Sequence, residues 1–389
     1  MHAEIKNNTS IPIENKMDRI SVCVQSIYEN EAIELVTITC DDMGYKTPNF
    51  TTSGIFRVHG LVKLTNKLKP WCVILKIIKP DTAEKDRLEH HNYWRREALV
   101  FESGVLNELP DSISAAKSFL VEEQQDGTVW IWMEYIEGEY AHTIEQLSYI
   151  ARRLGRFNGA YLTGIKTVPN HEWICRAWLK SWTTASRMYA PDMKEYASRI
   201  ATENEQSMWA WYQEILQSID SMLDSLQQLP RVLAHQDLGQ MNMLLVNKEA
   251  GESQLVLIDW QFMSISGIGE DLGKLFGVHL SLGVISPDEY ISFQTSVFDA
   301  YIEGLRDKGW QGDARLARYG FCLSTALRSV WEVPQFFYTL AQLEKEPHNT
   351  QLKERFNQFS HIIAVHKQMA LEAGALFGGE EVDDSSPGS

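Results

Sequence analysis

The chain has 389 residues, 44% hydrophobic and 23% charged, a soluble globular balance with length enough for two domains or one two-lobed domain. Its formal net charge of −16 argues against a nucleic-acid partner, because contact with phosphates needs a face rich in Lys and Arg. Five scattered cysteines without a CxxC pair argue against a disulfide scaffold or a zinc module.

Both ends of the chain are polar. Residues 1–17 contain no apolar signal core, and residues 378–389 are rich in Gly, Ser and acidic side chains. We therefore expect a flexible N-terminus over 1–17 and a disordered tail over 378–389. No stretch approaches the roughly 20 apolar residues that span a bilayer. The sequence thus predicts a cytoplasmic protein without a membrane partner.

The chain up to Glu137 is predicted to be mainly β-structure. The residues Gln125, Asp126 and Gly127 separate two apolar runs and are typical of a hairpin turn. Helices are expected in two places, at 20–28 and 84–103. The expected strands are 33–40, 54–58, 72–78, 118–122 and 129–135.

Beyond Gly138 the pattern becomes helical. Apolar residues from Ile144 to Leu162 recur at helical spacing. The remaining helical patterns cover about 174–228, 270–283, 287–307, 314–343 and 350–375, whereas 231–262 is predicted to form loops and short strands. We therefore expect an N-terminal lobe over 18–137 and a larger, helical C-terminal lobe over 138–377.

One segment, VLAHQDLGQMNMLLV (232–246), places polar side chains between two apolar runs. His235, Asp237 and Asn242 cannot stay buried there without partners or a ligand. The next apolar run ends at Asp259, and a turn-rich linker predicts a hairpin that brings Asp259 beside Asn242. Such an oxygen-rich site suits Mg²⁺.

The spacing resembles the catalytic loop of kinases, in which an Asp precedes an Asn by five residues and a later strand ends in another Asp. The segment HQDLGQMN, followed by Ile258-Asp259-Trp260, is similar to the aminoglycoside phosphotransferase and choline kinase superfamily. This resemblance implies an α+β, protein-kinase-like fold with a small antiparallel-sheet N-lobe and a larger, mainly helical C-lobe. It also implies that Asp237 accepts the proton of a small-molecule hydroxyl, and that Asn242 and Asp259 hold Mg²⁺.

The resemblance implies a nucleotide site in the N-terminal lobe. Lys76 ends an apolar run, and Glu97 on the following helix is expected to pair with it so that it orients the nucleotide phosphates. Ser53 and Gly54, within the segment 51–58, are expected to form a turn that covers the phosphates. Taken alone, Lys76 would be a snorkelling lysine and 51–58 an ordinary turn.

The segment MEYIEG (133–138) falls where the hinge between the lobes should lie. In this fold the hinge backbone binds the adenine edge, which assigns that role to Glu134 and Ile136. Taken alone, the segment would be a plain strand end. The resemblance also implies that Asp271 and His235 brace the catalytic loop without acting in catalysis.

The acceptor is expected to be a small molecule. Asp259 and Asp271 are 12 positions apart, which leaves no room for the activation segment of a protein kinase. An aminoglycoside, an amino alcohol and another hydroxylated metabolite all remain open. Several tryptophans could bind a cationic amine through cation–π contacts, although each is more often a core residue. These are Trp173, Trp178, Trp182, Trp209 and Trp211.

We therefore predict an O-phosphotransferase that uses Mg²⁺ and ATP or GTP to phosphorylate a small-molecule hydroxyl. Two alternatives remain. The chain could be a pseudokinase-like module that binds nucleotide without turnover, or a metal-dependent hydrolase that uses His235, Asp237 and Asp259. The acceptor, the nucleotide preference and the oligomeric state are not determined by the sequence.

Overall fold

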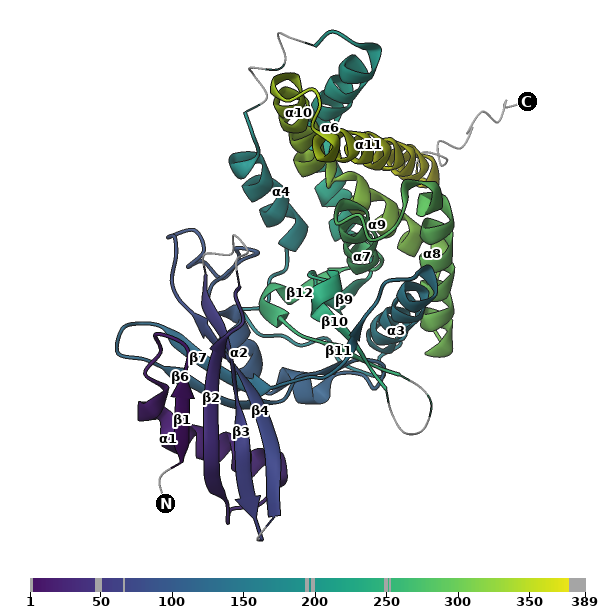
Figure 1. Cartoon of the computed structure of the whole chain (residues 1–389). Coiled ribbons are helices and arrows are strands. Elements are labelled where there is room, and N and C mark those ends of the chain that lie inside the picture. The colour runs from purple at the N-terminus through teal and green to yellow at the C-terminus, as the bar shows by residue number, and fades with distance from the viewer. Residues whose placement is uncertain are drawn as a thin grey trace, which may run out of the picture. The chain divides into compact units, whose positions relative to one another are not determined.

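The computed structural model describes residues 3–45, 51–65, 67–192, 196, 200–247, 251 and 253–377, and the expected tail lies outside them. The chain divides into two compact units, described separately below (Figure 1). The sheet unit comprises Met1–Leu109, Ile113–Glu139 and Leu244–Phe262. The helical unit comprises Pro110–Ser112, Tyr140–Met243 and Met263–Ser389. The predicted boundary at Glu137–Gly138 thus lies close to the break at Glu139.

A six-stranded sheet in the order β1-β2-β3-β4-β7-β6 forms the centre of the sheet unit (Figure 1). Neighbouring strands are antiparallel except β1 and β2, which are parallel. The sheet therefore confirms the predicted antiparallel N-terminal lobe. The strands are β1 (Glu4–Asn7), β2 (Glu34–Asp42), β3 (Thr52–Leu64), β4 (Lys67–Ile78), β6 (Ser118–Glu123) and β7 (Val129–Glu134).

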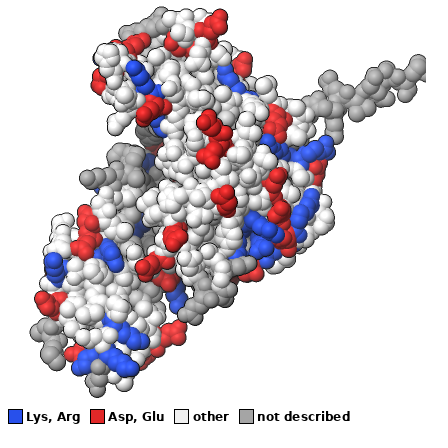
Figure 2. All heavy atoms as spheres, turned by 45° about the vertical axis from the view of Figure 1, so that its right-hand side comes forward, with Lys and Arg blue, Asp and Glu red and all other residues white. Residues whose placement is uncertain are grey.

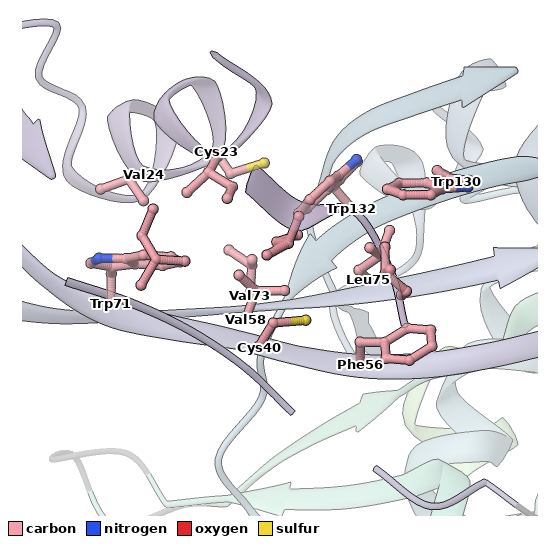
Figure 3. Packing of buried hydrophobic residues seen from close by; sticks show 14 of the residues in the cluster. Cys23, Val24, Cys40, Phe56, Val58, Trp71, Val73, Leu75, Trp130 and Trp132 are labelled. Carbon is pink, nitrogen blue, oxygen red and sulfur yellow. The ribbon is translucent and has the colours of Figure 1, made fainter. Parts of the chain in front are cut away.

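Helix α1 (Met17–Tyr28) covers one face of this sheet, and alternate strand residues point toward it. Figure 3 shows Cys23 and Val24 of α1 above Trp71, Val73 and other buried strand residues. The other elements of the unit are short. They are η1 (Ile13–Lys16), α2 (Arg96–Ser103), η2 (Val105–Glu108), η4 (Trp260–Phe262), and the small sheet β5 (Ser114–Ala115), β11 (Gln254–Leu257), β10 (Met243–Val246) and β8 (Glu139–Tyr140).

Residues 3–17 contain regular structure, where we expected a flexible segment. They contain β1, which pairs with β2, and η1. Ile11 and Ile13 are buried in the core beneath α1, and the Asn7 side-chain amide donates to the Ile11 carbonyl at 2.7 Å. The polar composition of this segment concealed two isolated apolar residues that anchor it.

The predicted helix over 84–103 is wrong for its first half, because only Arg96–Ser103 is helical. Turns occupy the preceding residues, and the fully buried Arg96 side chain satisfies their carbonyls. Its guanidinium donates to the carbonyls of Leu88, His90 and His91 at 2.7–2.9 Å. A buried guanidinium thus supplies the bonds that a helix would have made internally.

The helical unit confirms most of the expected helices, and α3 has the bounds that we predicted. The long pattern over 174–228 divides into α4 and α6, and the pattern over 314–343 divides into α9 and α10. None of the helices in the described part of the chain is long and apolar enough to cross a membrane. The helices are α3 (Ile144–Leu162), α4 (Trp178–Tyr189), α6 (Glu203–Gln227), α7 (Glu270–Ser281), α8 (Tyr290–Asp307), α9 (Ala314–Ala326), α10 (Ser329–Lys345) and α11 (Thr350–Phe377).

Short elements of the helical unit carry the HQDLGQMN segment. Strands β9 (Arg231–Ala234) and β12 (Ser264–Gly267) form an antiparallel pair, and the HQDLGQMN segment follows β9. Two short 3₁₀ helices complete the unit: η3 (Gln240–Asn242) and η5 (Pro287–Glu289).

Helices α3 and α8 pack with their backbones in close approach, which requires glycine on both sides. A Cβ atom added to Gly155 would lie 2.1 Å from the Tyr301 carbonyl oxygen, and one added to Gly304 would lie 2.1 Å from the Arg152 carbonyl oxygen. These distances are far shorter than van der Waals contact. Any side chain here must push the two helices apart.

We expect Gly304→Ala to destabilise the protein by about 1–3 kcal/mol or more, because its methyl group meets rigid backbone. Gly374→Ala in α11 is the matched control, because its Cβ meets no atom within 4 Å. That substitution should stabilise by up to about 1 kcal/mol, since alanine loses less backbone entropy in a helix. Urea unfolding followed by circular dichroism measures both, and equal effects of the same sign would contradict the close packing.

Candidate active site

The predicted ion pair is present in the sheet unit. Lys76, 3% exposed on β4, has its ammonium 2.5 Å from the Glu97 carboxylate and 2.9 Å from the Asp259 carboxylate. Burial opposes the charge on Lys76, but Asp259 and Glu97 outweigh it and raise its pKa. Burial, together with the nearby charge of Asp259, raises the pKa of Glu97, although Lys76 opposes the shift. One cation therefore serves two carboxylates.

The segment around Asp259 is held in place within the same unit. Asp259 has a φ of 61°, a left-handed conformation that is uncommon for a residue with a side chain. Two residues later, the Gln261 carbonyl accepts a hydrogen bond from Arg96 at 3.3 Å. Because Arg96 begins α2 and Glu97 follows it, the helix that carries Glu97 is tied to the segment that carries Asp259.

Ser53 and Gly54 lie in strand β3, so the turn predicted at these two residues is wrong, whereas the strand predicted over 54–58 is confirmed. Gly54 pairs with Ile77, one position beyond Lys76 on the neighbouring strand. The apolar residues that follow Gly54 favour strand, and a Cβ on Gly54 would lie 2.5 Å from the Phe56 ring. Residues 46–50, which precede β3, lie outside the described part of the chain.

The hinge candidates Glu134 and Ile136 lie at the end of β7 and just beyond it. The Glu134 backbone N–H donates to the Lys117 carbonyl at 2.9 Å, and its carboxylate accepts from the Lys117 N–H at 3.1 Å. These bonds fix the backbone where the strand ends. Adenine binding by this segment stays a prediction.

In the helical unit, the buried carboxylate of Asp271 binds the backbone of the HQDLGQMN segment. It accepts hydrogen bonds from the N–H groups of His235 and Gln236, both at 2.8 Å. Burial raises the pKa of Asp271 to about 6, although these two bonds oppose the shift. His235 is fully buried, and its Nδ1 accepts from the Asp237 N–H at 3.2 Å. The expected bracing by Asp271 and His235 is therefore confirmed.

Asp237 and Asn242 come together on this braced segment. The Asn242 side-chain amide donates to the backbone carbonyl and to the carboxylate of Asp237, each at 3.0 Å. Because its NH₂ group faces Asp237, the Asn242 carbonyl oxygen faces the other way and is available as a ligand. A tight turn allows this pairing, with the Gly239 N–H donating to the Asp237 carbonyl at 2.8 Å.

Lys274 on α7 is a site residue that the sequence analysis missed. Its ammonium lies 3.4 Å from the Asp237 carboxylate and 5.2 Å from the Trp178 ring centroid. Burial lowers the pKa of Lys274, while Asp237 opposes the shift. Its helical offset of three residues from Asp271 was the signal that could have found it, because that spacing puts both on one face of α7.

A cavity of about 10 Å³ adjoins Lys274, which is space for about one water. Trp178 and Trp182 are stacked along it with ring centroids 6.0 Å apart. Arg328 lies 5.6 Å from the Trp182 ring centroid, and Lys274 lies 5.2 Å from that of Trp178. Two of the five tryptophans singled out in the sequence therefore hold the protein's own cations.

Two polar links from α3 and α8 to this region were also missed. The Asn158 amide on α3 donates to the Leu233 carbonyl at 3.1 Å, just before the HQDLGQMN segment. The Tyr301 hydroxyl on α8 donates to Asn158 at 2.7 Å and accepts from the Gly269 N–H at 3.3 Å. The links join residues far apart in sequence, so nothing in the local pattern indicated them.

The predicted residues thus form two groups, one in each unit. Lys76, Glu97 and Asp259 meet in the sheet unit, whereas Asp237 and Asn242 meet in the helical unit. The expected pairing of β10 with β11 is confirmed, because the strands are neighbours in the four-stranded sheet. The convergence of Asn242 with Asp259 stays a prediction.

The antiparallel sheet with a paired lysine, the helical unit and the braced Asp-x₄-Asn segment agree with the protein-kinase-like fold that the resemblance implied. Residues 69–315 match the model of the phosphotransferase enzyme family (APH), so the chain belongs to this family. A search of curated protein sequences found no match.

Two solved structures illustrate the shared fold. Choline kinase from Cryptosporidium parvum Iowa II is 14% identical, with a TM-score of 0.52 over 92% of this chain and 98% of that chain. Amicoumacin kinase hAmiN, solved with AMP-PNP, Ca²⁺ and Ami, is also 14% identical, with a TM-score of 0.50 over 83% of this chain and 90% of that chain. At this identity the likeness concerns the fold.

The neighbour of Asp271, Glu270, gives a pH-dependent prediction. Burial raises the pKa of Glu270 from 4.5 to about 7, although Arg231 and the Gly267 N–H oppose the shift. The folded state therefore binds this proton more tightly than the unfolded state, and the contribution of Glu270 to stability falls as pH rises from about 4.5 to 7.

We expect Glu270→Gln to match the wild type near pH 4.5, where Glu270 is protonated in the folded state. The variant should then become more stable than the wild type by up to about 3 kcal/mol at pH 8, because glutamine does not ionise. Urea unfolding at several pH values measures the difference. Parallel stability curves for the two proteins would show that Glu270 ionises without cost.

Proposed function

We propose that this protein transfers the γ-phosphoryl group of ATP or GTP to a hydroxyl of a small molecule. The observation that carries the proposal is the Asp237–Asn242 pair on a segment whose backbone is bound by the buried Asp271. Phosphoryl transfer depends mainly on positioning and charge neutralisation. A braced loop that presents a carboxylate and an amide oxygen suits both tasks.

The sheet unit supplies the nucleotide site in this proposal. Lys76 is held in a fixed direction by Glu97, and its ammonium would bind the nucleotide phosphates. Ser53 and Gly54, next to Lys76 in the sheet, would approach the phosphates, and the backbone of Glu134 and Ile136 would bind adenine. The complex of amicoumacin kinase with AMP-PNP supports nucleotide use in a protein of this fold.

We assign the metal to Asn242 and Asp259. Both offer oxygen ligands, which Mg²⁺ prefers. Asn242 directs its NH₂ group to Asp237 and leaves its carbonyl oxygen available, while Asp259 uses one carboxylate oxygen for Lys76 and retains the other. A bound Mg²⁺ would neutralise the phosphate charge. The Ca²⁺ in the amicoumacin kinase complex supports a divalent cation.

Asp237 would accept the proton of the acceptor hydroxyl. Lys274 places a cation 3.4 Å from this carboxylate, so negative charge that develops on the acceptor oxygen would be stabilised from the helical unit as well. Burial lowers the pKa of Lys274, and in such an environment an ionic interaction is stronger than in water.

We propose a hydroxylated amine, such as an aminoglycoside or an amino alcohol, as the acceptor. The net charge of −16 favours the approach of cations, and the solved structures of this fold include a choline kinase. Recognition by Trp178 and Trp182 would require displacement of Lys274 and Arg328, which already lie against these rings.

The hydrolase alternative fits the structure less well. It needs His235 as a metal ligand, yet His235 is fully buried and its Nδ1 accepts from the Asp237 N–H. Within the described residues, no group of three or more His, Cys, Asp or Glu side chains is arranged to hold a metal ion. It also leaves the Lys76–Glu97 pair without a task.

A release assay for ADP or GDP over a panel of hydroxylated amines and neutral alcohols, with Mg²⁺ and each nucleotide, tests the proposal. We expect turnover with at least one acceptor. Asp259→Asn should reduce this turnover by roughly 10²-fold or more, because the Mg²⁺ that would neutralise the phosphate charge loses a carboxylate ligand. The exposed Asp288→Asn is the control and should retain wild-type turnover. Nucleotide binding without turnover over the whole panel would instead support a pseudokinase.

A further inference from the structure

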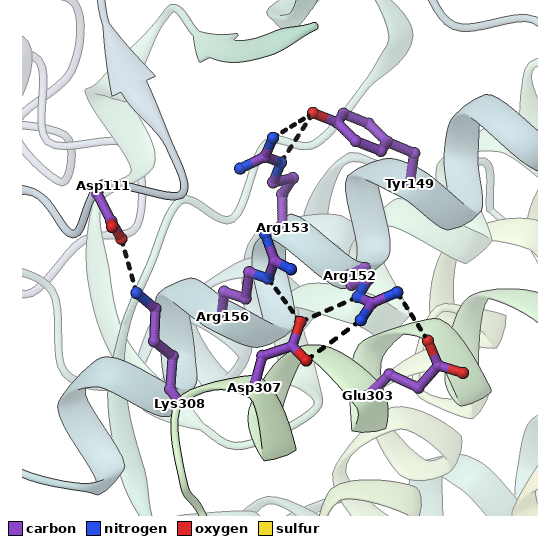
Figure 4. Close-up of polar contacts among 8 residues, drawn as sticks. All are labelled: Asp111, Tyr149, Arg152, Arg153, Arg156, Glu303, Asp307 and Lys308. Atoms are coloured by element: carbon purple, nitrogen blue, oxygen red, sulfur yellow. Dashed lines mark hydrogen bonds and ion pairs between the residues drawn. The ribbon is translucent and has the colours of Figure 1, made fainter. Parts of the chain in front are cut away.

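A hollow of about 270 Å³ lies between residues 110–112, α3 and the end of α8, all within the helical unit. Three cations line it, with two carboxylates and Ser112. Figure 4 shows most of these side chains with their polar contacts. The hollow is far larger than the cavity beside Lys274, and the proposed phosphotransfer does not use it.

The cations reach the hollow from two helices. Arg153 and Arg156 are three residues apart on α3 and therefore lie on one face, and Lys308 follows the last residue of α8. The close packing at Gly155 and Gly304 brings the two helices together here. Three cations face two carboxylates at the hollow, a local positive excess in a chain of net charge −16. Elsewhere, Figure 2 shows basic and acidic side chains intermixed over the face that it draws.

The carboxylates in this cluster leave room for a ligand anion. Asp307 is bound between Arg152 and Arg156 at 2.6–3.2 Å. Asp111 pairs with Lys308 at 2.8 Å, but its side chain is 82% exposed, and exposed ion pairs are weak. Asp111 can therefore turn into solvent and release Lys308 at little cost.

The surroundings favour a negative charge at the position of Asp111. Its hydrogen bond from Lys308, together with the charges of Lys308, Arg156 and Arg153, holds the pKa of Asp111 below its usual range. The positive groups therefore act together on an anion at this point. A ligand anion with more charge than one carboxylate would gain more from the same groups.

Ser112 provides the observation that points to a ligand. It lines the hollow and is only 4% exposed, yet its hydroxyl has no hydrogen-bond partner within the described structure. A buried hydroxyl without a partner is costly, so such groups usually bind a ligand or an ordered water. Here the hydroxyl is next to Asp111, the residue that occupies the anion position.

We propose that this hollow binds the phosphate group of a small phosphorylated molecule. Lys308 and Arg156 supply donors from two helices, which suits a tetrahedral group with several charged oxygens. Arg153 donates to the Tyr149 hydroxyl at 2.6 and 2.8 Å and adds its positive charge at the edge of the hollow.

The Ser112 hydroxyl oxygen is closed to solvent in this structure and would donate to one of these oxygens after rotation about the Cα–Cβ bond. The phosphate takes the place of the Asp111 carboxylate beside Lys308. The site lies on α3 and α8, so it does not depend on the proposed function.

Isothermal titration calorimetry tests the proposal on the full chain. Inorganic phosphate and glycerol 3-phosphate are titrated separately, with glycerol as the uncharged control and with saturating Mg²⁺–AMP-PNP to occupy a nucleotide site. We expect saturable binding of a phosphate compound and none of glycerol. Tighter binding of glycerol 3-phosphate would identify a phosphate ester as the ligand, and tighter binding of inorganic phosphate would identify the free ion.

Three substitutions separate a binding site from an ion-pair network that only joins the helices. Lys308→Gln should weaken phosphate binding roughly tenfold or more, and Ser112→Ala by roughly two- to tenfold, because each removes a donor to the ligand. Arg152→Gln is the matched control, since Arg152 binds Asp307 and Glu303 but does not line the hollow, and it should change the affinity less than about twofold.

Absence of saturable binding in the wild type would overturn the proposal. Equal weakening by Arg152→Gln and Lys308→Gln would also overturn it, because the anion would then respond to the general charge of the surface. Circular dichroism of each variant confirms that the comparison is made between folded proteins.

Discussion

A buried ammonium requires carboxylates close to it, and this constraint organises the sheet unit around Lys76. Removal of its charge from water is costly, so the ion is stable there only with close partners. Glu97 and Asp259 supply them at 2.5 and 2.9 Å, from a helix and from the segment after β11. Arg96 on that helix donates a hydrogen bond to the Gln261 carbonyl. The two segments that supply the carboxylates for Lys76 are therefore bound to each other.

The helical unit also buries a charged group, in this case a negative one. The Asp271 carboxylate is buried and is stabilised by two backbone N–H groups rather than by a cation alone. One of these belongs to Gln236, whose φ of 60° is unfavourable for a residue with a side chain. The hydrogen bonds thus hold a strained backbone next to Asp237, whose side chain is partly exposed.

The sequence was informative where a pattern is local or where a charge is out of place. The helical spacing over 144–162 predicted α3, and the lone charge of Lys76 in an apolar run predicted a partner. It was uninformative where distant groups meet. The carbonyls of the turns before α2 accept hydrogen bonds from the side chain of Arg96, the first residue of that helix. Lys274 reaches Asp237 only because Asp271 fixes the HQDLGQMN segment over α7. The contacts of Arg96 leave no periodic trace, and that of Lys274 shows in the sequence only as its three-residue offset from Asp271.

The role of Asp237 is the central claim, and Asp237→Asn tests it most directly, because the substitution preserves size and abolishes proton acceptance. Single-turnover kinetics with the best acceptor, together with calorimetry of Mg²⁺-nucleotide binding, separates chemistry from binding. We expect the rate of phosphoryl transfer to fall by roughly 10²- to 10⁴-fold while nucleotide affinity and thermal stability stay close to those of the wild type. An unchanged rate, or loss of nucleotide binding, would contradict the assignment of Asp237 as the proton acceptor.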